Sequence, residues 1–120
     1  MSGYEKLKIY QQALQGIKIV HELFEQHPQL KRDFELKNQI FRAAISIASN
    51  IAEGYGRGSK KDFMYFISVS LGSINEVKTH IDIITIIHQV DTQKIKQFYI
   101  QLGKQTWTFR QTLLKPKTDN

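Results

Sequence analysis

The sequence predicts an all-α fold, an antiparallel four-helix bundle with up-down-up-down topology. Apolar residues recur at three- and four-residue spacing along nearly the whole chain, which is typical of amphipathic helices. Only two prolines occur, Pro28 and Pro116, and each lies where a helix is expected to begin or end. A chain of 120 residues fits one domain, here 1–120, and four helices with short connections favour antiparallel neighbours.

The first two helices are expected over about 4–26 and 33–55. Pro28 ends the first, because the residue before a proline avoids the α region. The second helix carries a core stripe and, beside it, a further apolar row. That row consists of Phe41, Ile45, Ala48 and Ala52. An apolar surface this wide indicates a central position in the fold or an additional interface.

A glycine-rich segment over 54–58 is expected to end the second helix. Three of its five residues are glycine, and glycine accepts the positive φ that helix ends require. Ser59 follows as the expected N-cap of the third helix, with Asp62 at the third helical position, an arrangement similar to a capping box.

The third and fourth helices are expected over about 60–89 and 92–114. The isoleucine-rich run over 81–87 favours a strand by propensity alone. The helical spacing, however, stays in phase far beyond the length of a strand, so we expect a helix. Asp91 or Thr92 is the expected cap of the fourth helix.

Composition indicates a soluble cytoplasmic protein. The absence of cysteine excludes disulfides and thiolate metal sites and fits a reducing compartment. The most apolar window, over 81–90, is far shorter than the ~20 apolar residues that span a bilayer. The N-terminus lacks the apolar run of a signal peptide.

The net charge is +6, and residues 94–120 carry +5 of it. Such a segment fits a polyanion partner, although a solvated helix face remains an equally good interpretation. The candidate nucleic-acid-binding residues are Arg57, Lys60, Lys61, Lys94, Lys96, Lys104 and Arg110. Because no base-reading motif or aromatic platform is recognisable, binding is expected to act through phosphates and to be salt-sensitive.

A row of polar residues on the second helix lies at steps of four, four and three, with a similar polar spot on the third helix. These candidate interface or structural residues are Arg42, Ser46, Asn50, Glu53, Ser73 and Glu76. We expect them to bond across the two helices, and a site for a separate ligand is the alternative. Replacing Arg42 or Asn50 by alanine is expected to destabilise the protein by roughly 1–3 kcal/mol.

No pattern typical of an enzyme occurs. There is no strand-turn-helix elbow for a nucleophilic serine, no pair of Glu-x-x-His motifs for a di-iron site, and no Gly-Lys-Ser/Thr ending on the glycine-rich segment. His80 and His88 are interpreted as partly buried bundle histidines. We therefore expect no catalytic residue, no metal and no cofactor.

One long motif and several single residues carry a family resemblance. They are Arg42-Ala-Ala-Ile-Ser-Ile-Ala-Ser-Asn-Ile-Ala-Glu-Gly54, Arg57, Ser59, Phe63, Phe66 and Gly72-Ser73-x-x-Glu76, with Ile9-Tyr10, Pro28, Phe34, Leu36 and Gln39 upstream. This pattern resembles that of bacterial four-helix-bundle proteins encoded in intervening sequences of large-subunit ribosomal RNA genes. The match weakens after about residue 90. His27 stands where that family usually has phenylalanine, and His88-Gln89 where a glycine is common.

The resemblance implies a bundle that assembles into a ring, typically a pentamer, with a basic surface. The accessory protein of diversity-generating retroelements is similar and binds nucleic acid together with its reverse transcriptase. We therefore expect a non-enzymatic homo-oligomer that binds structured RNA or DNA, with ribosomal RNA intervening sequences as its context. A protein–protein adaptor, or an accessory subunit of a nucleic-acid enzyme such as a reverse transcriptase, is the alternative. A nuclease using Glu53 or His80 is a third hypothesis, based only on the genomic context of such relatives.

Overall fold

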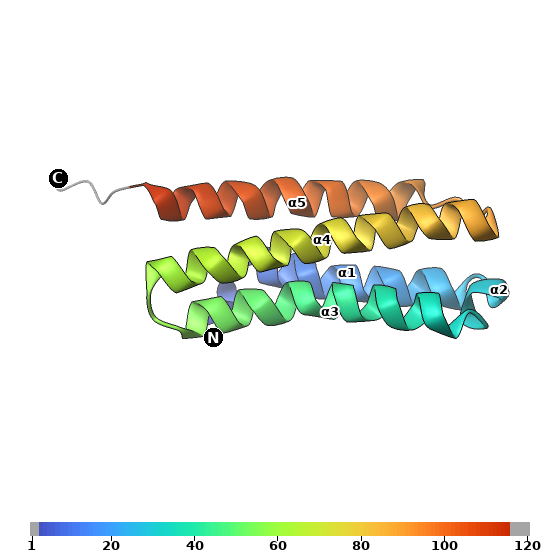
Figure 1. Cartoon of the computed structure of the whole chain (residues 1–120), viewed down its shortest axis with the longest axis horizontal. Coiled ribbons are helices and arrows are strands. Elements are labelled where there is room, and N and C mark those ends of the chain that lie inside the picture. Colours follow the sequence, from blue (N-terminus) through green and yellow to red (C-terminus); the bar gives the residue numbers. More distant parts are fainter. Residues whose placement is uncertain (1–2, 116–120) are drawn as a thin grey trace.

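The computed structural model describes residues 3–115, and every regular element within that range is a helix. The elements are η1 (Tyr4–Lys6), α1 (Lys8–Glu25), α2 (Pro28–Lys31), α3 (Phe34–Gly56), α4 (Lys60–His88) and α5 (Gln93–Leu114). The four long helices run alternately up and down in a body of 56 × 22 × 20 Å (Figure 1). The predicted all-α four-helix bundle is confirmed. Pro116, expected to end the last helix, lies outside the described residues.

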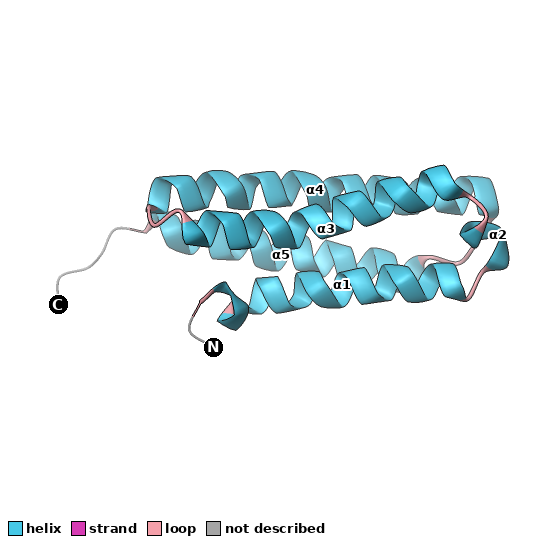
Figure 2. Cartoon of the chain, turned by 90° about the horizontal axis from the view of Figure 1, so that it is seen from below, coloured by secondary structure: helices cyan, strands magenta, loops and turns pink. Residues whose placement is uncertain are grey.

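Helices that follow one another in the chain are neighbours around the bundle. The most extensive contact joins α3 and α4, followed by α4 with α5 and α1 with α3. The bundle closes where α1 meets α5, and this contact is the least extensive of the four. Viewed from below, α1 and α3 lie side by side in front of α4 and α5 (Figure 2). With fewer contacts to its neighbours, α5 buries fewer of its residues than α3 does.

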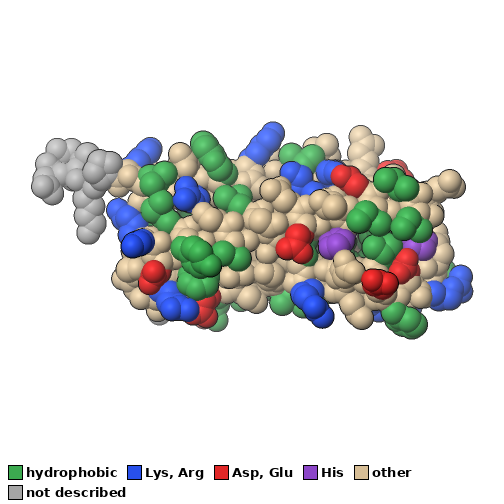
Figure 3. Space-filling model, viewed as in Figure 1, with side chains coloured by type: hydrophobic (Ala, Val, Ile, Leu, Met, Phe, Trp, Pro, Cys, Tyr) green, Lys and Arg blue, Asp and Glu red, His purple; other side chains and the backbone are tan. Residues whose placement is uncertain are grey.

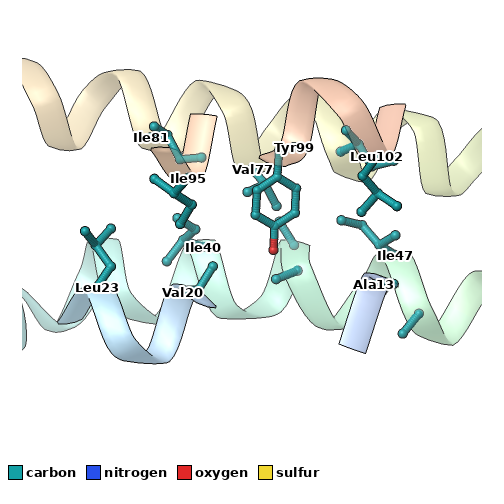
Figure 4. Packing of buried hydrophobic residues seen from close by; sticks show 14 of the residues in the cluster. Ala13, Val20, Leu23, Ile40, Ile47, Val77, Ile81, Ile95, Tyr99 and Leu102 are labelled. Atoms are coloured by element: carbon teal, nitrogen blue, oxygen red, sulfur yellow. The ribbon is translucent and has the colours of Figure 1, made fainter. Parts of the chain in front are cut away.

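The core is built from the apolar stripes of all four long helices. Its fully buried side chains include Val20 of α1, Ile40 of α3, Ile81 of α4 and Leu102 of α5 (Figure 4). Burying each such side chain contributes roughly 1.5–3 kcal/mol. This shared burial stabilises helices whose intrinsic propensity is modest, including the isoleucine-rich end of α4.

Tyr99 is the largest fully buried side chain, and a glycine makes room for it. Its ring crosses from α5 toward α1 and α3 (Figure 4). A Cβ atom on Gly16 of α1 would lie 2.5 Å from the Tyr99 hydroxyl oxygen and 3.0 Å from Cε1 of Phe98. The absence of a side chain at position 16 therefore allows α1 and α5 to close over the tyrosine.

The segment between α1 and α3 forms a short helix of its own. Pro28 occupies its first turn, where the missing N–H is not needed, and His27 before it is extended with φ −132° and ψ 97°. Leu30 is fully buried and ties this short helix to the core. Pro28 thus ends α1, as expected, and also begins α2.

Asp33 connects the start of α3 to the end of α4. One carboxylate oxygen accepts a hydrogen bond from the backbone N–H of Leu36, 3.2 Å away, and the other lies 2.9 Å from Nε2 of His88. The hydrogen bond with His88 lowers the pKa of the Asp33 carboxyl below its ordinary value. His88 is half-buried, as the sequence predicts, and its imidazole joins two helix ends.

The glycine-rich segment does not act as a uniform helix breaker. Only Gly58 has a positive φ, at 82°, whereas α3 continues through Gly56. Gly54 is buried within the helix, and a Cβ atom there would lie 2.7 Å from Cβ of Phe66. Gly54 therefore permits close packing of α3 on α4. Ser59 caps α4 as predicted, accepting a hydrogen bond from the N–H of Asp62 at 3.1 Å.

The connection from α4 to α5 contains a residue in the left-handed region. Gln89 has φ 56° and ψ 36°, a conformation that favours glycine. Thr92 is the N-cap residue of α5, but its hydroxyl bonds to that of Thr85 at 2.6 Å. Asp91 instead accepts the N–H of Gln93 at 3.0 Å. In the described part of the chain, no helix is apolar over a length that could cross a membrane.

Candidate nucleic-acid interface

A groove between α4 and α5 gathers basic and aromatic side chains. Two open hollows lie along it: one of about 640 Å³ between the start of α4 and the end of α5, and one of about 680 Å³ nearer the middle. The residues that we call the α4–α5 groove are Lys60, Lys61, Tyr65, Lys78, Lys104, Trp107 and Arg110. Figure 3 shows Lys and Arg side chains over α4 and α5 with hydrophobic side chains between them. Within the described range, neither hollow is lined by an aspartate or glutamate.

Arg110 is held at the surface of this groove by a bond between the two helices. Its Nε donates to the hydroxyl of Ser68 at 2.7 Å. This hydrogen bond restrains the guanidinium group. A guanidinium carries five N–H donors, so four remain for a partner. Arg110 can therefore present a preformed site for a phosphate, which two parallel N–H groups bind well.

The seven candidate basic residues do not all share this groove. Lys60, Lys61, Lys104 and Arg110 line it, and Lys96 lies further along between the same helices, where it pairs with Asp82.

The remaining two candidates lie elsewhere. Lys94 lies between α1 and α5 near Glu22. Arg57 lies at the turn between α3 and α4, 2.9 Å from the carboxylate of Glu53 and 4.9 Å from the ring centre of Phe66. The structure therefore supports four of the seven as parts of one surface.

The second set of predicted residues lies between α3 and α4. The hydroxyl oxygens of Ser46 and Ser73 are 2.9 Å apart, and the Asn50 amide donates to the carbonyl and the hydroxyl of Ser46 at 2.8 and 2.9 Å. Beside them the buried Ser70 hydroxyl donates to the Ile47 carbonyl at 2.9 Å. These small polar side chains satisfy one another where the two helices pack closely.

Three members of that predicted set stay outside this network. Arg42 and Glu76 are exposed, and Glu53 is exposed and engaged by Arg57. Of the six predicted residues, Ser46, Asn50 and Ser73 therefore form the network between α3 and α4, and the other three do not join it within the subunit. Helical spacing placed them correctly on neighbouring positions, but α4 covers only the part of the row that faces it.

Comparison with known proteins assigns the chain to a family. A family model described as 23S rRNA-intervening sequence protein matches residues 5–106. The chain belongs to this family.

A solved structure supports the fold of this family member. It is that of a protein with unknown function from the S23 ribosomal protein family of Bacteroides thetaiotaomicron, similar with a TM-score of 0.76. The two share 18% sequence identity, and the match covers 85% of this chain and 97% of the other. At this identity the likeness establishes the four-helix architecture alone. No curated protein matches the chain.

Sequence reasoning missed three groove residues of this intervening-sequence protein. Lys78, Tyr65 and Trp107 line the same two hollows as the predicted lysines. Tyr65 and Trp107 are 63% and 55% exposed, so the groove presents two aromatic side chains that the sequence analysis did not single out. The missed signal is positional: Trp107 follows the buried Thr106 and is therefore turned off the core stripe of α5.

The histidine and carboxylate side chains of residues 3–115 are spread along the bundle, with His88 and Asp33 in contact as a pair. Among the described residues, no three His, Asp or Glu side chains are grouped closely enough to hold a metal ion. His80 is half-buried, and its Nδ1 atom has no hydrogen-bond partner within the described part of the protein.

Replacing Asn50 by alanine is expected to lower the free energy of unfolding by about 1 kcal/mol, because two hydrogen bonds to Ser46 are lost. Arg42→Ala is the matched comparison on the same helix. It is expected to change stability by less than about 0.5 kcal/mol in the isolated subunit, since Arg42 is exposed. Urea unfolding followed by circular dichroism measures both changes. An Asn50→Ala variant as stable as the parent would contradict the role of this network.

Proposed function

We propose that this intervening-sequence protein is a non-enzymatic, cytoplasmic homo-oligomer that binds structured RNA or DNA through the phosphates. The observation that carries the proposal is the concentration of basic side chains in the α4–α5 groove, whose two hollows have no acidic lining residue in the described range. The family description refers to intervening sequences of 23S rRNA, which makes ribosomal RNA the first ligand to test.

Electrostatics sets the expected behaviour of this groove. Lysine and arginine neutralise phosphates and release the counterions condensed on the nucleic acid, so affinity falls as salt rises. With about four phosphate contacts, the affinity should fall by about 100-fold between 50 and 200 mM salt. Because phosphate contacts carry no base information, binding at these side chains should depend weakly on sequence.

The test compares two variants with the same loss of charge. One replaces Lys60, Lys61, Lys104 and Arg110 of the groove by alanine. The control replaces Lys6, Lys18, Lys31 and Arg42, which are exposed and lie outside the groove. For a ribosomal RNA fragment at 50 mM salt, the groove variant is expected to bind about 100-fold more weakly, and the control only a few-fold more weakly.

Anisotropy of a labelled RNA measures these affinities across the salt series. Failure of the parent protein to bind RNA at low salt would overturn the proposal. An equal loss of RNA affinity in both variants would show that the α4–α5 groove is not the binding site. Seven of the eight side chains are exposed, so their replacement is expected to change stability by no more than about 0.5 kcal/mol each. Arg110 is half-buried and bonds to Ser68, so its replacement is expected to cost about 1 kcal/mol.

Exposed apolar side chains on α1 and α3 favour a second role, docking of subunits or of a partner protein. Leu14 is 44% exposed and Ile45 of the predicted apolar row is 49% exposed, while Phe41 is half-buried and Ala48 buried. A ring of copies, with a pentamer as the expected size, would cover part of this face. Light scattering at micromolar concentration measures the assembly, and a monomer would count against the homo-oligomer. An adaptor for a nucleic-acid enzyme would use the same face for its partner.

A further inference from the structure

We infer that the α4–α5 groove binds single-stranded segments, with an unpaired base stacked on Trp107 and its flanking phosphates held by Lys78 and Lys104. The inference rests on the nucleic-acid binding proposed above. It goes further in two ways. It identifies a residue that contacts bases, and it predicts a preference for single strands, which phosphate contacts alone would not produce.

The position of Trp107 is the first observation. The indole is 55% exposed on α5 and lines the hollow of about 680 Å³ between α4 and α5. Apolar side chains of both helices, including Leu71 and Ile100, line the same hollow. Gly103 lies one turn before Trp107 and brings no side chain into this space. The surface beside the indole is therefore open and partly apolar, as the face of a base requires.

The charges around the indole identify the kind of occupant. Lys78 of α4 and Lys104 of α5 line the hollow together with Trp107. A second copy of this chain, with a net charge of +6, would bring further positive charge to a cationic site. A polyanion that also carries flat apolar groups matches both properties. Single-stranded nucleic acid is such a ligand, and base–aromatic stacking with cationic side chains is how sequence-tolerant sites commonly bind it.

The preference for single strands follows from which bases expose a face to the indole of Trp107. In a duplex, each base is stacked on its neighbours and its faces are covered, so an exposed side chain cannot stack on it. Unpaired bases in loops, bulges and ends can turn outward and stack on an aromatic ring. A structured RNA would then meet the groove at an unpaired segment.

A second aromatic residue extends the same surface. Tyr65 lines the neighbouring hollow with Lys60, Lys61 and Arg110, and it is 63% exposed. Its ring packs edge-on against Phe66 with ring centres 5.1 Å apart, which limits its movement. Aromatic and cationic side chains therefore share both hollows of the groove, giving space for more than one nucleotide.

Trp107 is the single tryptophan of the chain, so fluorescence excited selectively at tryptophan, and not at the five tyrosines, reports on this position alone. The full-length protein is titrated at low salt with an oligouridine of about 12 nucleotides and with a duplex RNA of the same length. The oligouridine is expected to quench the emission strongly, because base stacking quenches indole fluorescence, and the duplex is expected to quench it weakly. Polyglutamate serves as a polyanion without bases and is expected to leave the emission unchanged.

Anisotropy of labelled oligouridine then tests the contribution of the side chain. Trp107→Ala is expected to weaken binding by about 10- to 100-fold, whereas Trp107→Phe keeps most of the affinity. The dependence on salt should stay the same in both, since no charge is removed. Phe34→Ala is the control, because Phe34 is an aromatic residue 71% exposed on α3, outside the groove.

The outcomes separate this inference from the proposal on which it rests. If the parent binds neither RNA at low salt, both fail. If RNA binds while Trp107 emission is unchanged and Trp107→Ala binds like the parent, only the stacking inference is overturned. Quenching by polyglutamate equal to that by oligouridine would also overturn it.

Discussion

Replacing Tyr99 by alanine is expected to lower the free energy of unfolding by about 3–5 kcal/mol, whereas phenylalanine at this position is expected to leave it unchanged or slightly higher. The ring of Tyr99 is fully buried between the helices, so its removal leaves a cavity that the packed neighbours cannot fill. The hydroxyl contributes differently. It is buried with no hydrogen-bond partner in the described part of the protein.

The environment of this hydroxyl explains the contrast between the two variants. Burial raises the pKa of Tyr99 well above its ordinary value, because the phenolate would lose its hydration. The neutral hydroxyl also loses hydration without gaining a bond, so phenylalanine removes an unfavourable contribution and keeps the packing.

Urea unfolding followed by circular dichroism measures both Tyr99 variants against the parent. A loss of more than about 1 kcal/mol in Tyr99→Phe would show that the hydroxyl is hydrogen-bonded, and would contradict this account.

Replacing Gly16 by alanine is expected to destabilise the protein by about 1–3 kcal/mol, although alanine has the higher helix propensity. The new Cβ atom would lie 2.5 Å from the hydroxyl oxygen and 2.9 Å from Cζ of Tyr99. A fully buried ring has little room to move, so α1 and α5 must separate or the ring must leave its position. The steric cost exceeds the gain in propensity of about 1 kcal/mol.

Gly72→Ala is the matched control for this prediction. Gly72 lies within α4, is exposed, and has no neighbouring atom within 4 Å of the position of a Cβ. Only helix propensity acts there, so the variant is expected to be more stable by about 0.5–1 kcal/mol. The double variant Gly16→Ala/Tyr99→Phe should recover part of the loss, because the nearest clashing atom is gone. Equal stability of Gly16→Ala and Gly72→Ala would show that Tyr99 is not packed against Gly16.

Much of the fold could be predicted because its signals are local. The spacing of Ile67, Ile74 and Ile81 defines the buried face of α4 from the sequence alone, since positions seven apart lie almost in line on a helix. Ser59 could be assigned as a cap because its hydrogen bond is made to a residue only three positions away. The structural role of each glycine could not be predicted from the sequence in the same way, because glycine allows a positive φ in the turn at Gly58 and close helix packing at Gly54.

The candidate site was predicted less well, because it depends on which faces of different helices meet. The basic residues of α5 are visible in the sequence, but their separation into Lys104 in the groove and Lys94 beside α1 depends on the rotation of that helix in the bundle. Lys78 joins them from α4, 26 residues before Lys104 in the chain. Arg42 shows the converse, because its spacing from Ser46 is right and its side chain is nevertheless exposed.

By itself, the sequence determined the all-α class, the approximate helix ends and the family of this protein. Helix periodicity, caps and prolines act over a few residues, so these properties can be read without knowing what packs against them. Only the tertiary structure decided that Gly16 lies against Tyr99, and that Trp107 lies exposed in a groove with Lys78 and Lys104. Those contacts join residues far apart in the chain, and their geometry follows from how four helix faces share one core.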